Sequence, residues 1–142
     1  MLCATMALNG FISMGVSQDW GTHMIGHEIS ALHNTTHGQS LVIVFPALMR
    51  VMGKQKQEKI LQYGARVWNI TTGSNEEKIE KTIVKTEEFF RSLGLVTKLS
   101  EINIGQDTID EIVNRFQTRG TMLGEKENIT PDVVKQILEL AK

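Results

Sequence analysis

The sequence predicts an all-α protein built from six or seven helices. Apolar residues recur at intervals of three and four along successive segments, which is the pattern of helices that bury one face. Two signals that start helices precede such segments: the capping-box pattern of Ser74 and Glu77, and the Thr130-Pro131 pair. No segment clearly favours a strand, and the chain contains neither an internal repeat nor a low-complexity stretch.

The first helix is expected over residues 2–15, where small and large apolar residues recur at helical spacing. Because apolar side chains would lie all round it, we expect this helix to be buried. No capping residue precedes Leu2, so the chain is expected to begin inside a helix. Residues 15–21 are expected to form a loop, with Trp20 packed in the core rather than in a substrate pocket.

The second helix is expected to run from Thr22, as its cap, to Leu32, and the polar residues 34–36 end it. The third is expected to follow Gly38 and to run to about Met52, with a kink at Pro46. The Val- and Ile-rich part of this segment also suits a β-strand. The helical spacing that continues beyond it favours a helix.

Residues 54–59 form a short charged stretch that we interpret as the solvated face of a helix running on to Trp68. The capping box at residues 74–77 begins the next helix, which Gly94 is expected to end. Residues 95–105 show no strong pattern and are expected to be a linker.

The last two helices are expected to begin at Asp107 and at Pro131. The first carries apolar residues at helical spacing and is closed by Gly120. The second is capped by Thr130 and runs to the end of the chain. We expect all the helices to pack around the strongly apolar second and third ones.

The composition excludes several classes of function. With 142 residues, the chain is long enough for one domain with a proper core. A net charge of -1 gives no basic face for nucleic acid or an anionic membrane. The single cysteine, Cys3, excludes an internal disulfide framework. The apolar start lacks a basic region and a cleavage site, and no apolar run is long enough to span a membrane, so a soluble cytoplasmic protein is expected.

All four histidines lie within fifteen residues, at His23, His27, His33 and His37. On a helix, His23 and His27 project from one face, one turn apart, and could chelate a divalent ion. A loop turning back would bring His37 against the same face. Spacing leaves two alternatives open: a metal site, or histidines that are merely satisfied polar residues. Zinc, iron and nickel all accept imidazole, so the donors do not select the metal.

Two carboxylates lie close to the histidines in the sequence. Asp19 and Glu28 could each be a ligand or could orient one, although a solvated surface position is the preferred interpretation for Glu28. The H-E-x-x-H pattern of zinc proteases is absent, and the chain has neither a G-x-G-x-x-G nor a P-loop pattern. No phosphate-binding loop for a dinucleotide is therefore expected within these residues.

The sequence resembles the iron-containing alcohol dehydrogenases, most closely their butanol dehydrogenase and NADPH-dependent aldehyde reductase branch. The resemblance covers essentially the whole chain. The matching stretches are Met6-Ala-Leu-Asn-Gly10, Gln18-Asp-Trp20, His23-Met-Ile-Gly-His27-Glu28, His37-Gly38, Leu61-Gln-Tyr63 and Val67-Trp-Asn-Ile70.

The resemblance implies roles for three of the histidines. His23 and His37 match two ligands of a divalent metal, Fe²⁺ or Zn²⁺, and this revises the spacing argument, which favoured His23 with His27. His27 matches a catalytic histidine that lies beside the nicotinamide of NADP or NAD and the substrate. His33 matches no functional position. The implied activity is the interconversion of small alcohols and aldehydes.

The resemblance also implies an architecture. Members of the family are two-domain enzymes with a dehydroquinate synthase-like fold, more than twice this length, and residues 1–142 match the C-terminal helical metal-binding domain. The N-terminal domain, with the dinucleotide site and two further ligands, is expected to be missing, so this chain alone is expected to be inactive. The face that would meet that domain is expected to be apolar, which favours a homo-oligomer.

Two other interpretations remain. The chain could be a free-standing helical metal-binding or interaction module without catalysis. It could also be a structural helical bundle whose histidines are incidental, which predicts no metal binding at all.

Overall fold

The structure, a computed structural model, describes residues 1–142 and is all-α, as predicted. It contains seven α-helices and two short 3-10 helices, and the segment that competed as a strand is helical. The helices in chain order are α1 (Leu2–Leu8), η1 (Phe11–Ser13), α2 (Gly21–His33), α3 (His37–Val51), α4 (Gln57–Trp68), α5 (Asn75–Ser92), η2 (Leu99–Ile102), α6 (Gln106–Arg119) and α7 (Pro131–Ala141). The only β-type pairing is an isolated bridge between Leu123 and Ile129.

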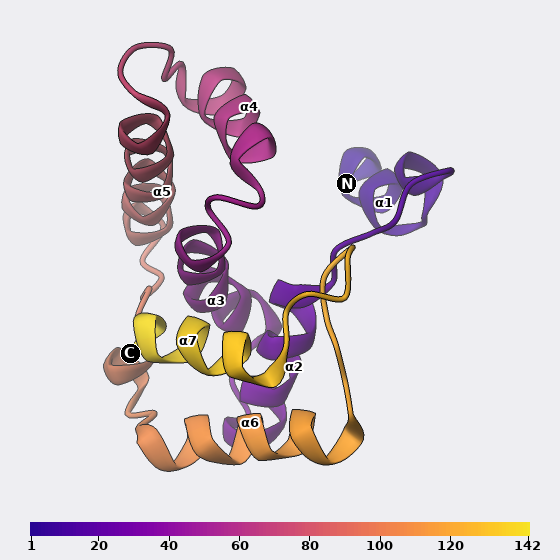
Figure 1. The fold of residues 1–142 in the computed structure, drawn as a ribbon. Coiled ribbons are helices and arrows are strands. Elements are labelled where there is room, and N and C mark those ends of the chain that lie inside the picture. The colour runs from indigo at the N-terminus through magenta and orange to yellow at the C-terminus, as the bar shows by residue number, and fades with distance from the viewer.

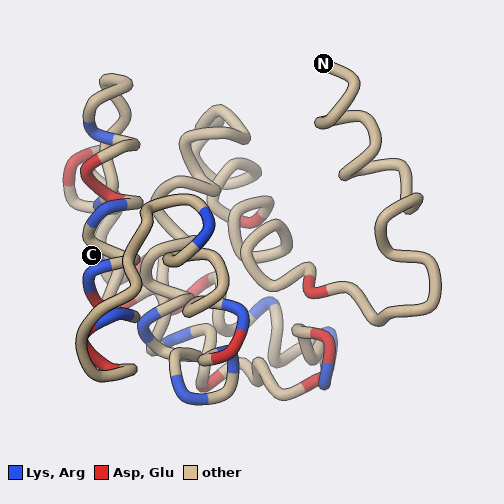
Figure 2. Tube along the Cα trace, turned by 90° about the horizontal axis from the view of Figure 1, so that it is seen from above, with Lys and Arg blue, Asp and Glu red and all other residues tan.

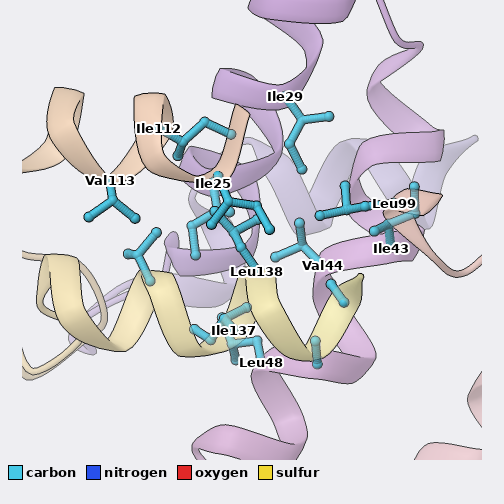
Figure 3. Close-up of a cluster of buried hydrophobic side chains, with 14 of the residues drawn as sticks. Ile25, Ile29, Ile43, Val44, Leu48, Leu99, Ile112, Val113, Ile137 and Leu138 are labelled. Carbon is cyan, nitrogen blue, oxygen red and sulfur yellow. The ribbon is translucent and has the colours of Figure 1, made fainter. Parts of the chain in front are cut away.

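The main core lies where α2 and α3 meet α6 and α7 (Figure 1). Ile25 and Ile29 from α2, Val44 from α3 and Leu138 from α7 are all fully buried and project toward one another (Figure 3). Burial of one such side chain contributes about 1.5–3 kcal/mol, so this cluster is the largest source of stability in the fold. The two most apolar helices are therefore central, as the sequence predicted.

The helices α4 and α5 form a hairpin that extends away from α6 and α7 (Figure 1). A second, smaller cluster of buried side chains, Met49, Ile60 and Ile83, joins this hairpin to α3. The guanidinium of Arg50 on α3 also pairs with Glu80 at 2.8 Å and Glu87 at 2.7 Å on α5. No helix in the chain has the length and apolar character that crossing a membrane requires.

Two of the predicted helix starts are confirmed, and one is wrong. Ser74 accepts a hydrogen bond from the backbone N–H of Glu77, whose carboxylate accepts one from Ser74 N–H. Thr130 caps α7 through its hydroxyl alone, which accepts a hydrogen bond from the backbone N–H of Val133. Thr22, however, lies inside α2. The carboxylate of Asp19 instead accepts a hydrogen bond from the N–H of Gly21, the first residue of the helix, at 2.7 Å.

The N-terminal segment differs most from the prediction. The expected buried helix over residues 2–15 ends at Leu8, because Gly10 adopts a left-handed conformation with φ of 82° and starts a separate 3-10 turn. Nothing in the chain covers this segment, so its side chains are exposed rather than buried. It carries no charged residue before Asp19 and stands apart from the helical body (Figure 2). Its large exposed apolar residues are Met1, Leu2, Met6, Leu8, Phe11, Ile12, Met14 and Val16.

The segment expected as a linker over residues 95–105 is also ordered into the core. It contains η2, and the side chains of Leu99 and Ile104 are buried in the main cluster. A single short turn leaves too few residues for a periodic pattern, so its burial was not apparent from spacing.

Candidate functional site

Three of the four histidines meet on one side of the α2–α3 pair. His23 and His27 lie one turn apart on α2, and His37 is the first residue of α3. Asn34, with a left-handed φ of 51°, ends α2 and reverses the chain within three residues. The reversal places the His37 ring centroid 5.2 Å from that of His23 and 5.0 Å from that of His27. The expected return of His37 against the α2 face is therefore confirmed.

The three rings are not equally exposed. His23 is half-buried, whereas His27 and His37 are exposed at the surface of the chain. Burial, followed by the neighbouring His37 and His27 rings, lowers the pKa of His23 below its ordinary value. The His23 ring therefore stays neutral at neutral pH, which is the form that can donate a lone pair to a metal.

The ring spacing suits a shared ion. Two imidazoles that bind one ion through nitrogens at about 2.1 Å hold their ring centroids about 5 Å apart. The spacings of His37 to His23 and to His27 match this distance, and the 6.2 Å between His23 and His27 exceeds it. Yet no group of three or more histidine, cysteine, aspartate or glutamate side chains is placed to hold a metal ion within this chain. These donors fit part of a metal site and need further ligands to complete one.

The two nearby carboxylates are already engaged. Glu28, expected at the solvated surface, is instead buried on the face of α2 that meets α6, where it pairs with Arg115 at 3.2 Å and with Arg119. Asp19 accepts from Gly21 N–H and pairs with a lysine. Neither carboxylate points a free oxygen at the histidines as a ligand.

His33 lies apart from the other three histidines. It is the last residue of α2, and its Nε2 lies 2.8 Å from the hydroxyl of Thr108 on α6. This contact accounts for the side chain without a metal. His33 does not join the cluster, in keeping with its lack of a functional counterpart in the resemblance.

Trp20 stands at the edge of the cluster rather than in the core. Its ring meets that of His23 edge-on, with centroids 5.2 Å apart and an angle of 78° between the planes, and it is 38% exposed. The expectation of core packing is therefore wrong. Trp20 and His23 line a recess whose other wall is formed by Ala4, Ala7 and Leu8 of the N-terminal segment.

Sequence reasoning missed one residue beside the site. Lys56, within the stretch interpreted as solvated, is largely buried and pairs with both Asp19 and Glu125. Its partners are 37 and 69 residues away in the sequence, so no local pattern could have indicated the contact.

The chain is similar to a well-defined group of proteins. The family model for the C-terminal part of the Fe-containing alcohol dehydrogenase family matches residues 1–142. Among curated relatives, the NADPH-dependent aldehyde reductase YqhD of Escherichia coli is 46% identical over the whole chain and 37% of its own length. The NADH-dependent butanol dehydrogenase A of Clostridium acetobutylicum is 31% identical over the whole chain and 36% of its own length.

Solved structures agree with this grouping. The crystal structure of YqhD from Escherichia coli matches with a TM-score of 0.95, covering all of this chain and 37% of that one. The NADH-dependent butanol dehydrogenase A of Thermotoga maritima matches with a TM-score of 0.88 at 30% identity, covering 99% of this chain and 37% of its own. The chain thus spans a little over a third of the length of the relatives it matches.

Proposed function

This chain belongs to the Fe-containing alcohol dehydrogenase family, and from that premise we propose that it forms the helical part of a metal-dependent oxidoreductase. The complete enzyme interconverts small alcohols and aldehydes with NADPH or NADH, the cofactors printed in the names of the relatives. The observation that carries the proposal is the meeting of His23, His27 and His37 on the α2–α3 pair.

In this proposal His23 and His37 hold a divalent metal, Fe²⁺ or Zn²⁺. Both are imidazole donors, their centroid spacing suits a shared ion, and the lowered pKa of His23 favours the neutral, binding form. When bound, such an ion acts as a Lewis acid that polarises the substrate oxygen. The exposure of His37 leaves room for ligands from outside the chain to complete the coordination.

His27 is assigned to the substrate and the nicotinamide rather than to the metal. The ring spacings fit either His23 or His27 beside His37, so the assignment follows the match of His27 to the catalytic histidine of the family. His27 is exposed and lies one turn beyond His23 on the same helix, where a substrate from outside the chain can reach it. An imidazole there can give a proton to the substrate oxygen during reduction and take one during oxidation. Its position on a well-packed helix holds the ring at a constant place relative to the two ligands.

The chain is assigned only part of the active site. It contains no glycine-rich phosphate loop, and it spans a little over a third of its relatives' length. We assign the dinucleotide site and the remaining metal ligands to a further domain of the complete enzyme. The purified 142-residue chain is therefore expected to show no NAD(P)H-dependent aldehyde reduction, and robust turnover by it would contradict this division.

Titration with Co²⁺, followed by its visible absorption, tests the metal ligands. His23→Ala and His37→Ala are each expected to weaken Co²⁺ binding by about tenfold or more. His33→Ala is the matched control, because it removes an imidazole from the same segment that lies against Thr108 instead. Unchanged Co²⁺ uptake in both ligand variants would refute the assignment.

A chimera tests catalysis. Replacing the matching third of Escherichia coli YqhD by this chain is expected to give a folded, NADPH-dependent aldehyde reductase, because the two share 46% identity and one fold. In that chimera His27→Ala is expected to lower kcat by about 10²–10⁴-fold with metal content unchanged. A folded chimera that binds metal and NADPH but does not turn over would favour a module without catalysis.

A further inference from the structure

Three segments that are distant in the sequence meet at the ammonium group of Lys56. The residue lies immediately before α4. It donates hydrogen bonds to Asp19, in the loop before α2, and to Oε2 of Glu125 at 2.6 Å, in the segment between α6 and α7. The side chains of Lys56, Asp19 and Glu125 are 15%, 25% and 32% exposed, so the group is shielded from water. Shielding strengthens the attraction between the opposite charges.

Asp19 links this ion pair to the start of α2. One carboxylate oxygen, Oδ1, accepts from the N–H of Gly21 at 2.7 Å, and the other, Oδ2, accepts from Lys56. The N-cap position, Trp20, offers no side-chain hydrogen bond. Asp19 thus supplies the acceptor for the first N–H of α2, and Lys56 holds Asp19 in place.

The start of α2 is also closely packed. A Cβ on Gly21 would lie 2.8 Å from Cδ1 of Ile129 and 3.1 Å from Cδ1 of Leu48, so a larger residue here would have to displace the ends of both side chains. The segment that carries Ile129 is tied back to the turn before α4, because the side-chain amide of Asn128 donates to Gln55. Lys56 therefore links the loop before α2, the turn before α4 and the segment between α6 and α7, which together surround the first turn of α2.

His23 lies in that first turn, two residues after Gly21, whereas His37 is carried by α3. A shift of the start of α2 changes the position of His23 relative to His37. We propose that Lys56 is a positioning residue for the histidine cluster, which acts through Asp19 to set the separation of these two rings. The inference rests on the proposed function, in which the two rings bind one metal.

The charges explain why a neutral side chain could not replace Lys56. Burial opposes the charged ammonium, but hydrogen bonds from Lys56 to Asp19 and Glu125 outweigh it and raise the pKa of Lys56. Without the cation, two carboxylates would face each other across a shielded space and repel. Asp19 would then turn toward water, and Gly21 N–H would lose its acceptor.

Co²⁺ titration of single variants of the 142-residue chain tests the proposal. Lys56→Met is expected to weaken Co²⁺ binding by about tenfold and to alter the visible Co²⁺ band, because the geometry of the ligands changes. Lys56→Arg is expected to restore most of the affinity. Lys59→Met is the control, because Lys59 lines a pocket together with Lys56 and Asp19 but forms no ion pair. Equal losses in Lys56→Met and Lys59→Met would overturn the proposal.

If Lys56→Met does not fold, as shown by loss of its helical circular dichroism, the Asp19→Asn variant tests the proposal instead. An asparagine oxygen can still accept from Gly21 N–H, but the charge that holds Lys56 is gone, so Co²⁺ affinity is expected to fall. Wild-type affinity in a folded Lys56→Met or Asp19→Asn variant would overturn the inference. If His23→Ala and His37→Ala still weaken binding in that case, the proposed function stands and only the role of Lys56 fails.

Discussion

The contact between α4 and α5 predicts that Gly64→Ala will destabilise the protein, whereas a glycine-to-alanine substitution inside a helix usually stabilises it. A Cβ on Gly64 would lie 2.1 Å from Oγ1, 3.2 Å from Cβ and 3.3 Å from Cγ2 of Thr82. Thr82 is fully buried, and its hydroxyl already donates to the backbone oxygen of Lys78. The side chain cannot turn away without losing that bond, so the two helices must separate.

The size of the stability change follows from one stabilising effect and two destabilising ones. Replacing glycine by alanine inside a helix normally stabilises it by about 1 kcal/mol. Overpacking a closed contact costs about 1–3 kcal/mol. Separation of the helices also strains the hydrogen bonds that Tyr63 and Trp68 on α4 make to the hydroxyl of Thr86, each worth about 1 kcal/mol. We expect Gly64→Ala to lower the free energy of unfolding by about 2 kcal/mol.

Urea unfolding followed by circular dichroism measures this effect as a lower midpoint at constant slope. Gly38→Ala is the matched control, because nothing lies within 4 Å of the added Cβ and the helix should gain up to about 1 kcal/mol. Thr82→Ala in the Gly64→Ala background should recover part of the loss, since the closest atom is removed. A Gly64→Ala variant as stable as the wild type would refute the reasoning.

Four further outcomes are expected. Glu28→Gln should lower Tm clearly, whereas Glu111→Gln should not, because only the first carboxylate is buried between helices; equal Tm values would contradict this. Hydrogen bonding with a neighbouring aspartate and the paired ammonium lower the pKa of Glu125 to about 2, from an ordinary 4.5. Its stabilising contribution should thus be complete above about pH 4.5 and vanish toward pH 2, so Tm curves of wild type and Glu125→Gln should converge on acidification. Thr130→Ala should cost about 1 kcal/mol in urea unfolding through loss of the α7 cap. The exposed apolar N-terminal segment should make the chain self-associate, and Phe11→Glu should reduce the sedimentation coefficient at high concentration; a monomeric wild type would contradict it.

Elements with local signals were predictable from the sequence. The capping box at Ser74 and the cap at Thr130 each use atoms within three residues, and both are present in the structure. Gly120 ends α6 in the left-handed conformation, as a glycine after the last apolar residue indicates. The positions of α2, α3, α6 and α7 followed from apolar spacing, because each buries one continuous face.

Features that depend on distant partners were not predictable in this way. Glu28 looked like a surface residue because its two arginines lie 87 and 91 residues farther along the chain. Lys56 looked solvated for the same reason. Thr22 was a plausible cap, but the turn before α2 brings the carboxylate of Asp19 to the helix start instead. The prediction of a buried first helix was wrong for another reason. Its apolar sequence predicts burial, yet no other part of this chain covers the helix.

The candidate site lies between these two cases. The histidine cluster was apparent from composition, and the return of His37 to the α2 face was expected from the short polar segment between the helices. Spacing alone favoured His23 with His27, because it takes account only of positions on one helix. In the structure the His37 ring lies closer to both His23 and His27 than those two rings lie to each other, since a chain reversal brings the second helix closer than the next turn of the first.

The reversal at Asn34 also bears on how the protein folds. All three clustered histidines lie within the fifteen residues from 23 to 37, so their mutual arrangement depends on contacts of low contact order. The entropy lost on closing so short a loop is small, because it grows only with the logarithm of loop length. Local contacts between α2 and α3 are therefore enough to bring the three imidazoles together, and the long-range contacts of Lys56 are left only the finer adjustment of their separation.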